Sequence, residues 1–175
     1  MVHIFSLLSR KNNSALIEYF LDNPTIETYP QELEKKLKMS RQSMFKALEA
    51  ALDARLIEVK EIGRTKQYML RRNDPIVKQL KILSTIDSMQ RVIVKLKDIR
   101  AEIYLFGSAA RGEDTEKSDI DLLIISNAPK NEIIGKVAEK EKIKPLFFSY
   151  LEYSALARKD KPFYERVEKD RIRLI

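Results

Sequence analysis

The chain has 175 residues, of which 44% are hydrophobic and 34% charged, and this composition excludes a disordered protein. It contains one His and no Cys, and the lack of Cys excludes a disulfide framework and a thiolate zinc site. The net charge of +7 lies in the first hundred residues, because residues 1–74 hold 13 Lys and Arg against 10 Asp and Glu, residues 75–100 hold 6 against 2, and residues 101–175 hold 14 against 14. A basic front half favours a polyanionic partner such as nucleic acid, and a solvated lysine-rich surface is the alternative.

Three helices are predicted first in chain order. Apolar residues at helical spacing indicate a helix that Asn13 caps and that Asn23-Pro24 ends. Pro30 begins the second helix, because the first turn of a helix tolerates proline. Ser40 is a favourable N-cap for a third helix that runs to about Ala54.

A hairpin is predicted after the third helix. Apolar and polar residues alternate over 57–62, a turn with glycine covers 63–66, and a second strand returns over 67–70. With a brief strand over 25–29, the order of elements resembles that of winged helix-turn-helix domains, which bind double-stranded DNA. The resemblance covers residues 31–70 and implies that the third helix enters the major groove while the hairpin tip contacts phosphate or the minor groove. The side chains expected at that interface are Arg41, Gln42, Ser43 and Lys46 on the third helix and Arg64 and Lys66 at the hairpin tip.

Residues 75–100 form the next predicted region. Asp74-Pro75 opens a long stretch in which apolar residues recur at spacings of three and four, and Ser84 is a candidate break between two helices. The stretch is expected either to connect two domains or to supply the contact of a homodimer.

From Ala101 the pattern changes to alternating strands and helices, which is typical of an α/β domain. The predicted strands cover 103–106, 119–125, 143–149 and 171–175, and the predicted helices cover 131–142, a short segment from Leu151, and 163–169.

A glycine-serine pair follows the first of these strands. Gly107 lets the backbone approach a ligand closely, and Ser108 offers a hydroxyl at the start of a helix whose N–H groups favour phosphate. Arg111 is a candidate cation for phosphate or for nearby carboxylates. Asp119 and Asp121 stand two apart on the second strand, so they project from one face, and Mg²⁺ prefers such oxygen ligands.

The ordered combination of strand, Gly-Ser, helix, Arg-Gly and Ser-Asp-x-Asp resembles the minimal nucleotidyltransferases of the polymerase-beta-like superfamily. The signature spans residues 105–125, and the wider domain is expected over 92–175. The resemblance implies transfer of a nucleoside monophosphate from a nucleoside triphosphate, ATP among them, to a hydroxyl group, with Mg²⁺ as cofactor. It places phosphate at Gly107, Ser108, Arg111 and Ser118, and it makes Asp119 and Asp121 both catalytic residues and metal ligands.

The sequence departs from that family in one respect. The active members carry a third carboxylate on the strand after the intervening helix, whereas residues 142–149 contain no Asp or Glu, and Lys144 lies among them. Glu141 and Glu152 flank that strand and would need an unusual geometry to contribute. Whether the domain is an active transferase is therefore left open by the sequence.

We accordingly expect a two-domain α+β and α/β protein, with a winged helix over 1–74, a helical connector over 75–100, and a nucleotidyltransferase fold, a small mixed sheet with flanking helices, over 101–175. Two functions stay open: a Mg²⁺-dependent nucleotidyltransferase fused to a DNA-binding domain, or a catalytically impaired relative that regulates transcription or binds a protein partner as antitoxins do. The absence of a long apolar stretch and the lack of Cys favour a cytoplasmic protein rather than a membrane protein, and the many Lys and Glu favour a thermophile. The resemblance to minimal nucleotidyltransferases, which are common in archaea and bacteria, favours an archaeal-like protein.

Overall fold

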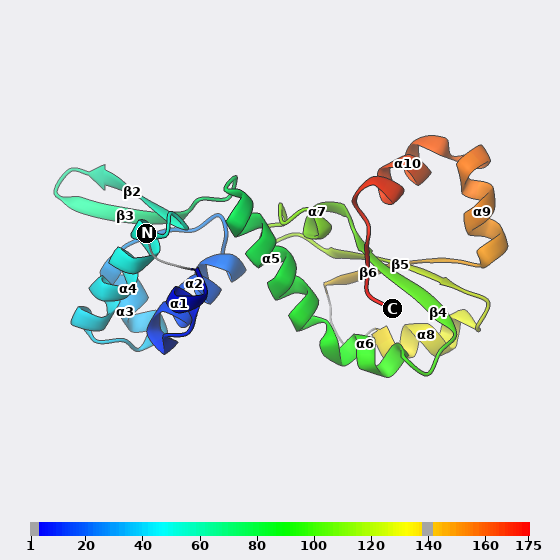
Figure 1. Cartoon of the computed structure of the whole chain (residues 1–175), viewed down its shortest axis with the longest axis horizontal. Coiled ribbons are helices and arrows are strands. Elements are labelled where there is room, and N and C mark those ends of the chain that lie inside the picture. The colour runs from blue at the N-terminus through cyan, green and yellow to red at the C-terminus, as the bar shows by residue number, and fades with distance from the viewer. Residues whose placement is uncertain (1–3, 138–141) are drawn as a thin grey trace. The chain divides into compact units, whose positions relative to one another are not determined.

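A computed structural model of the chain describes residues 4–137 and 142–175 (Figure 1). Two compact units make up this part of the chain, and the boundary between them falls between Leu80 and Lys81. None of the helices in the described ranges combines the length and the apolar character that crossing a membrane requires.

The N-terminal unit consists of short helices and a small antiparallel sheet. Its helices are α1 (Ile4–Leu8), α2 (Lys11–Asp22), α3 (Pro30–Leu37) and α4 (Arg41–Asp53). Its strands are β1 (Glu27–Thr28), β2 (Ile57–Ile62) and β3 (Thr65–Leu70), in the order β1-β3-β2. The predicted second and third helices and the hairpin are thereby confirmed, and the returning strand begins at Thr65, two residues earlier than predicted.

The ends of the helices follow from single residues. Lys38 ends α3 in the left-handed conformation, with φ of 51°, and two residues later the hydroxyl of Ser40 accepts a hydrogen bond from the backbone N–H of Ser43, which begins α4. The prediction that Asn13 caps α2 is wrong, because the helix begins at Lys11 and Asn13 is buried inside it.

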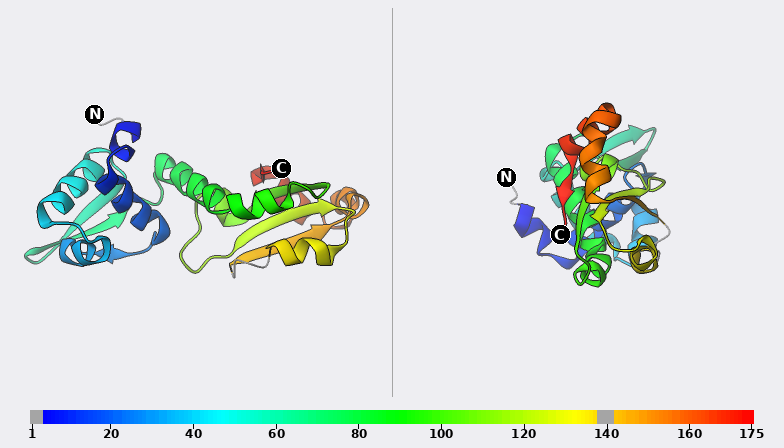
Figure 2. Two further views of the ribbon diagram at one scale, coloured as in Figure 1. Left: turned by 90° about the horizontal axis from the view of Figure 1, so that it is seen from below. Right: turned by 90° about the vertical axis from the view of Figure 1, so that its right-hand side faces the viewer.

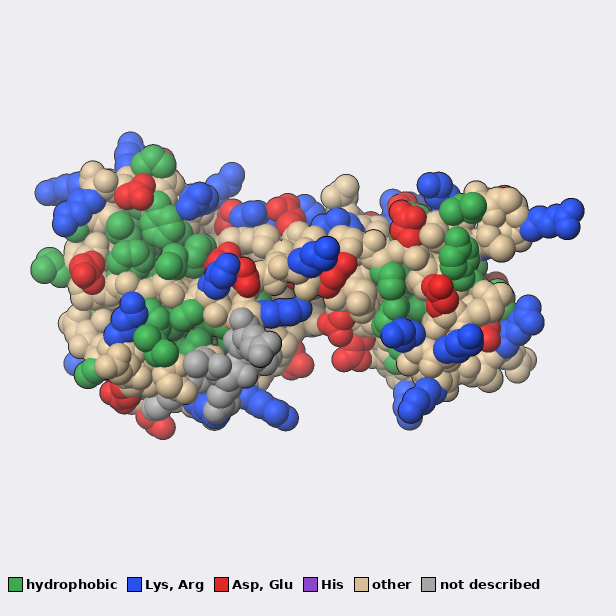
Figure 3. Space-filling view, turned by 180° about the vertical axis from the view of Figure 1, so that it is seen from behind, with side chains coloured by type: hydrophobic (Ala, Val, Ile, Leu, Met, Phe, Trp, Pro, Cys, Tyr) green, Lys and Arg blue, Asp and Glu red, His purple; other side chains and the backbone are tan. Residues whose placement is uncertain are grey.

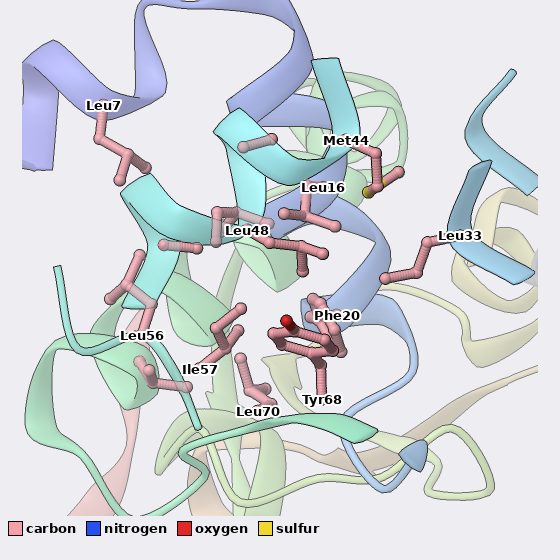
Figure 4. Close-up of a cluster of buried hydrophobic side chains, with 14 residues drawn as sticks. Leu7, Leu16, Phe20, Leu33, Met44, Leu48, Leu56, Ile57, Tyr68 and Leu70 are labelled. Atoms are coloured by element: carbon pink, nitrogen blue, oxygen red, sulfur yellow. The ribbon is translucent and has the colours of Figure 1, made fainter. Parts of the chain in front are cut away.

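The core of the N-terminal unit lies between α2, α3, α4 and the hairpin (Figure 4). Leu16 and Phe20 from α2, Leu48 from α4 and Tyr68 from β3 are almost wholly excluded from solvent. Burial of such side chains is the main stabilising contribution, of about 1.5–3 kcal/mol each, and it leaves the outer face of α4 and strand β2 exposed.

Helices α5 (Pro75–Ser88) and α6 (Gln90–Leu96) follow. The chain breaks between them at Met89 and not at Ser84 as predicted; Met89 is fully buried in a core, and Ser84 lies within α5. Leu83 and Val94 are exposed on this region, and a homodimer through it stays a prediction.

The C-terminal unit contains a four-stranded mixed sheet with helices on its two faces (Figures 1 and 2). The strands are β4 (Ala101–Phe106), β5 (Ile120–Ser126), β6 (Ile143–Phe148) and β7 (Ile172–Arg173), in the order β6-β5-β4-β7. The remaining helices are α7 (Gly107–Ala110), α8 (Lys130–Val137), α9 (Tyr150–Lys159) and α10 (Lys161–Asp170). Only the β5–β6 pair is parallel among the pairs of this sheet; β4 pairs antiparallel with both β5 and β7.

Side chains that alternate along the strands divide between two cores. One face packs against α6 and α8, and it includes the strand residues Ile103, Leu105, Leu122 and Ile124. The other face packs against α9 and α10, and it includes Tyr104, Phe106, Leu123 and Ile125. Asp121 shares the parity of Leu123, so its side chain belongs to the α9–α10 face, at the end of β5 where that strand begins.

The predicted strands and helices of this unit are confirmed within one or two residues where the structure describes them. The helix predicted over 131–142 is present as α8, and the part of that prediction that covers 138–141 lies outside the described residues.

Candidate active site

The end of strand β4 brings the chain to the proposed phosphate-binding turn. Gly107 follows Phe106 with φ of +75°, a left-handed conformation that favours glycine. A Cβ atom placed on Gly107 would lie 2.5 Å from Oδ2 of Asp121, so the carboxylate packs directly against the glycine backbone. The pairing of Phe106 with Asp121 in the β4–β5 register produces this approach.

A second carboxylate and a lysine lie beside Asp121. In the parallel β5–β6 register Asp121 is opposite Lys144, and the ammonium of Lys144 lies 2.5 Å from Oδ2 of Asp119. Burial raises the pKa of Asp121, and the charge of Asp119 raises it further, while Lys144 and Arg166 act in the opposite direction. The hydrogen bond to Asp119 raises the pKa of Lys144. Two carboxylates and a cation therefore share one end of the sheet.

The other predicted phosphate contacts lie in and around the loop between α7 and β5. Arg111 donates to Oε2 of Glu113 at 2.9 Å and to Oδ2 of Asp170 at 3.1 Å, so its charge is engaged by two acids and ties the loop to the end of α10. The hydroxyl of Ser118 accepts from the backbone N–H of Thr115 at 2.9 Å and thereby closes the loop. Ser108 is half-buried, and its carbonyl accepts from the backbone N–H of Glu113.

Similarity to a known protein family covers the part of the chain that carries Gly107, Asp119 and Asp121. The sequence profile of the nucleotidyltransferase domain matches residues 86–174, which is half of the chain. The chain belongs to the nucleotidyltransferase domain family. Among solved structures, a crystal structure from Sulfolobus solfataricus described as a nucleotidyltransferase is similar over 56% of this chain and 82% of that chain, with 19% identity and a TM-score of 0.33. No curated protein matches the chain.

The nucleotidyltransferase family implies a divalent metal, and the donor set tests that implication. Asp119 and Asp121 repel each other at one strand end, and their hard oxygen atoms are ligands that fit one such cation. The ammonium of Lys144 already pairs with Asp119 there. Within residues 4–137 and 142–175, no three His, Cys, Asp or Glu side chains gather where a metal could bind. Asp119 and Asp121 could therefore supply two oxygen ligands to a single cation, whose remaining ligands would have to come from other groups or from water.

The two flanking glutamates considered as a third ligand have different outcomes. Glu152 lies after the far end of β6, where its carboxylate accepts from the backbone N–H of Ser149 at 2.7 Å in the capping box of α9. Glu141 lies outside the described residues. Lys144 itself faces Asp119, so the alternative that it points away from the carboxylates is excluded by the contact.

Sequence reasoning missed two groups that shape this site. The charge of Arg166 on α10 lowers the pKa of Asp121, although more than forty residues separate the two in the sequence. Lys81 on α5 is 4% exposed and donates to Oδ2 of Asp114 at 3.0 Å, which fixes the loop before Asp119. The sequence around Arg166 gives no indication of its contact with the site. Lys81 lies among apolar residues of an amphipathic helix, and that position could have indicated a buried ion pair.

The residues predicted to contact DNA are placed on the surface of the N-terminal unit. Arg41, Gln42 and Lys46 are exposed on α4, whereas Ser43 is half-buried and its hydroxyl contacts that of Ser40 at 3.0 Å. Arg64 and Lys66 are exposed in the hairpin. Figure 3 shows Lys and Arg side chains of this unit standing among fewer acidic and some hydrophobic ones. An exposed aromatic residue that sequence reasoning missed, Phe45, lies beneath the Arg41 guanidinium, 5.8 Å from its ring centre.

Proposed function

We propose that the C-terminal unit binds a nucleoside triphosphate as its Mg²⁺ complex and transfers the nucleoside monophosphate to a hydroxyl acceptor. The observation that carries this proposal is the close packing of the Asp121 carboxylate against Gly107, because it joins the metal-binding strand to the turn that approaches phosphate. Membership of the nucleotidyltransferase domain family supports the same reaction class.

Each group has a chemical task in this proposal. The backbone at Gly107 and the hydroxyl of Ser108 would bind phosphate oxygens, and Asp119 and Asp121 would hold the metal. When bound, Mg²⁺ neutralises phosphate charge and increases the acidity of an attacking hydroxyl. Among the described residues no third carboxylate gathers with Asp119 and Asp121, so in this proposal the proton of that hydroxyl passes to solvent or to the acceptor, and we expect slow transfer.

The test separates binding from transfer. Binding of an α,β-methylene ATP in Mg²⁺ is measured by calorimetry, and transfer is measured with α-labelled triphosphates and protein, RNA and small-molecule acceptors. Asp121→Asn should abolish both, while Asp98→Asn, which removes an equal charge from an exposed position in the same unit, should leave both unchanged. Native protein that binds no nucleotide, or Asp121→Asn protein that transfers normally, would refute the proposal.

A second function is supported for the N-terminal unit. We propose that it is a winged helix that binds double-stranded DNA, with α4 in the major groove and the β2–β3 hairpin against the backbone. The support is the turn of Lys38 to Ser40 between α3 and α4, together with the exposed basic side chains Arg41 and Lys46.

Salt dependence is the discriminating measurement for DNA binding. Affinity for a mixed-sequence duplex should fall steeply with added salt, and Arg41→Ala with Lys46→Ala should reduce the slope of log affinity against log salt by about 2 if both contact phosphate. Arg91→Ala with Lys97→Ala is the matched control, because it removes one Arg and one Lys from exposed positions of α6 and its end. No binding at low salt, or equal losses in both double variants, would contradict the proposal.

A further inference from the structure

Lys144 lies on the strand where the active members of the family carry a third carboxylate, it is opposite Asp121 in the β5–β6 register, and its ammonium pairs with Asp119. We propose that Lys144 is an exchanging cation: without a divalent ion it pairs with Asp119 and offsets part of the charge of Asp119 and Asp121, and it moves to the triphosphate when a divalent ion binds those carboxylates. The inference rests on the proposed nucleotide-binding function and adds to it the residue that couples metal to phosphate.

The position of Lys144 suits exchange rather than a permanent bond. Its side chain is 68% exposed and that of Asp119 is 38% exposed, and an ion pair so open to water is weak. Strand β6 is at the edge of the sheet, so the four-carbon stem of Lys144 is not enclosed on its outer side by another strand. A lysine ammonium is also a compact point charge that binds phosphate well.

Charge balance predicts how the two ligands cooperate. Asp119 and Asp121 bring two negative charges; Lys144 pairs with Asp119, and the charges of Lys144 and Arg166 act on Asp121. A divalent ion that arrives alone must displace Lys144 and then remain close to its charge, so it binds weakly. When the divalent ion arrives together with a triphosphate, the triphosphate brings four negative charges to which the displaced ammonium can bind. Binding of the ion and binding of the triphosphate therefore favour each other.

Two ligands distinguish this role from a structural one. Mn²⁺ alone and the preformed complex of Mn²⁺ with α,β-methylene ATP are titrated by calorimetry into the native full-length protein and into Lys144→Met. Methionine keeps the unbranched stem at an exposed edge position and removes only the charge. We expect Mn²⁺ alone to bind about tenfold more tightly to Lys144→Met, because a unit charge about 5 Å from the ion is gone, and the complex to bind about tenfold more weakly.

The opposite signs are the signature of exchange, since a variant that merely distorts the site would weaken both ligands. Lys144→Arg should restore binding of the complex, and Lys130→Met, which removes a lysine that lies over Phe147 farther along β6, should change neither. If both ligands shift in the same direction, or neither shifts, in Lys144→Met, the exchange is refuted while native binding still stands. If neither the native protein nor Lys144→Met binds either ligand, the proposed nucleotide site fails and the exchange fails with it.

Discussion

Gly107→Ala tests the contact on which the active-site geometry depends. Alanine at φ of +75° enters a left-handed conformation that costs about 1–2 kcal/mol. Its Cβ would also lie 2.5 Å from Oδ2 of Asp121, so the carboxylate must rotate away at a further cost of roughly 0.5–1.5 kcal/mol. The expected loss of free energy of unfolding is about 1.5–3.5 kcal/mol, with loss of nucleotide binding because Asp121 no longer faces the turn.

Gly63→Ala provides the control, because Gly63 has φ of +60° and no atom within 4 Å of a Cβ placed there. Only the backbone cost of about 1–2 kcal/mol applies to it, and Gly63 lies in the N-terminal unit, outside the proposed nucleotide site. Hydrogen exchange of β4 and β5 amides reports on Gly107→Ala, and exchange of β2 and β3 amides reports on Gly63→Ala. If the two variants lose equal stability and Gly107→Ala binds nucleotide normally, the packing of Asp121 against the turn is refuted.

Three further changes test the packing of the molecule. Gly135→Ala, within α8 and with no atom within 4 Å of the added Cβ, should stabilise the C-terminal unit by about 0.5–1 kcal/mol in denaturant titration, and destabilisation would contradict the open surroundings of that helix. Ser40→Ala removes the N-cap of α4 and should cost about 1 kcal/mol, seen as faster amide exchange in that helix; unchanged exchange would show that the cap contributes nothing. Lys81→Met leaves Asp114 without its buried partner and should lower the unfolding free energy by roughly 3 kcal/mol. Adding Asp114→Leu in a double variant should restore most of that loss. If Lys81→Met is as stable as the native protein, the ion pair is contradicted.

Much of the fold could be predicted because it depends on local patterns. Ser40, Pro30 and the alternation over 57–62 fix their elements through capping, the first helical turn and strand periodicity, and all three are confirmed. The close approach of Gly107 to Asp121 could likewise be expected, since the strand before one and the strand through the other were both predicted.

The rest depends on contacts between distant parts of the chain. Asn13 has the chemistry of a cap, yet its burial in the core keeps it inside α2, so tertiary packing overrides the local preference. Arg111 was a candidate cation for phosphate or for nearby carboxylates, and only the structure places Asp170 of α10 beside it. Lys144 faces Asp119 because of the β5–β6 register, and the alternation of apolar and polar residues along a strand does not determine that register.

Helix α5 has a practical consequence for dividing the protein into fragments. Val77 and Leu80 belong with the first hydrophobic core and Ile86 packs on the second, although the boundary between units falls between Leu80 and Lys81. A fragment that started at Lys81 would begin in the middle of α5, so its first backbone N–H groups would lack the carbonyls that accept their hydrogen bonds. A fragment that stopped at Leu80 would lose the last turns of α5, which hold Val77 in place. Separate expression of either half should therefore retain the whole of Pro75–Ser88 in both pieces.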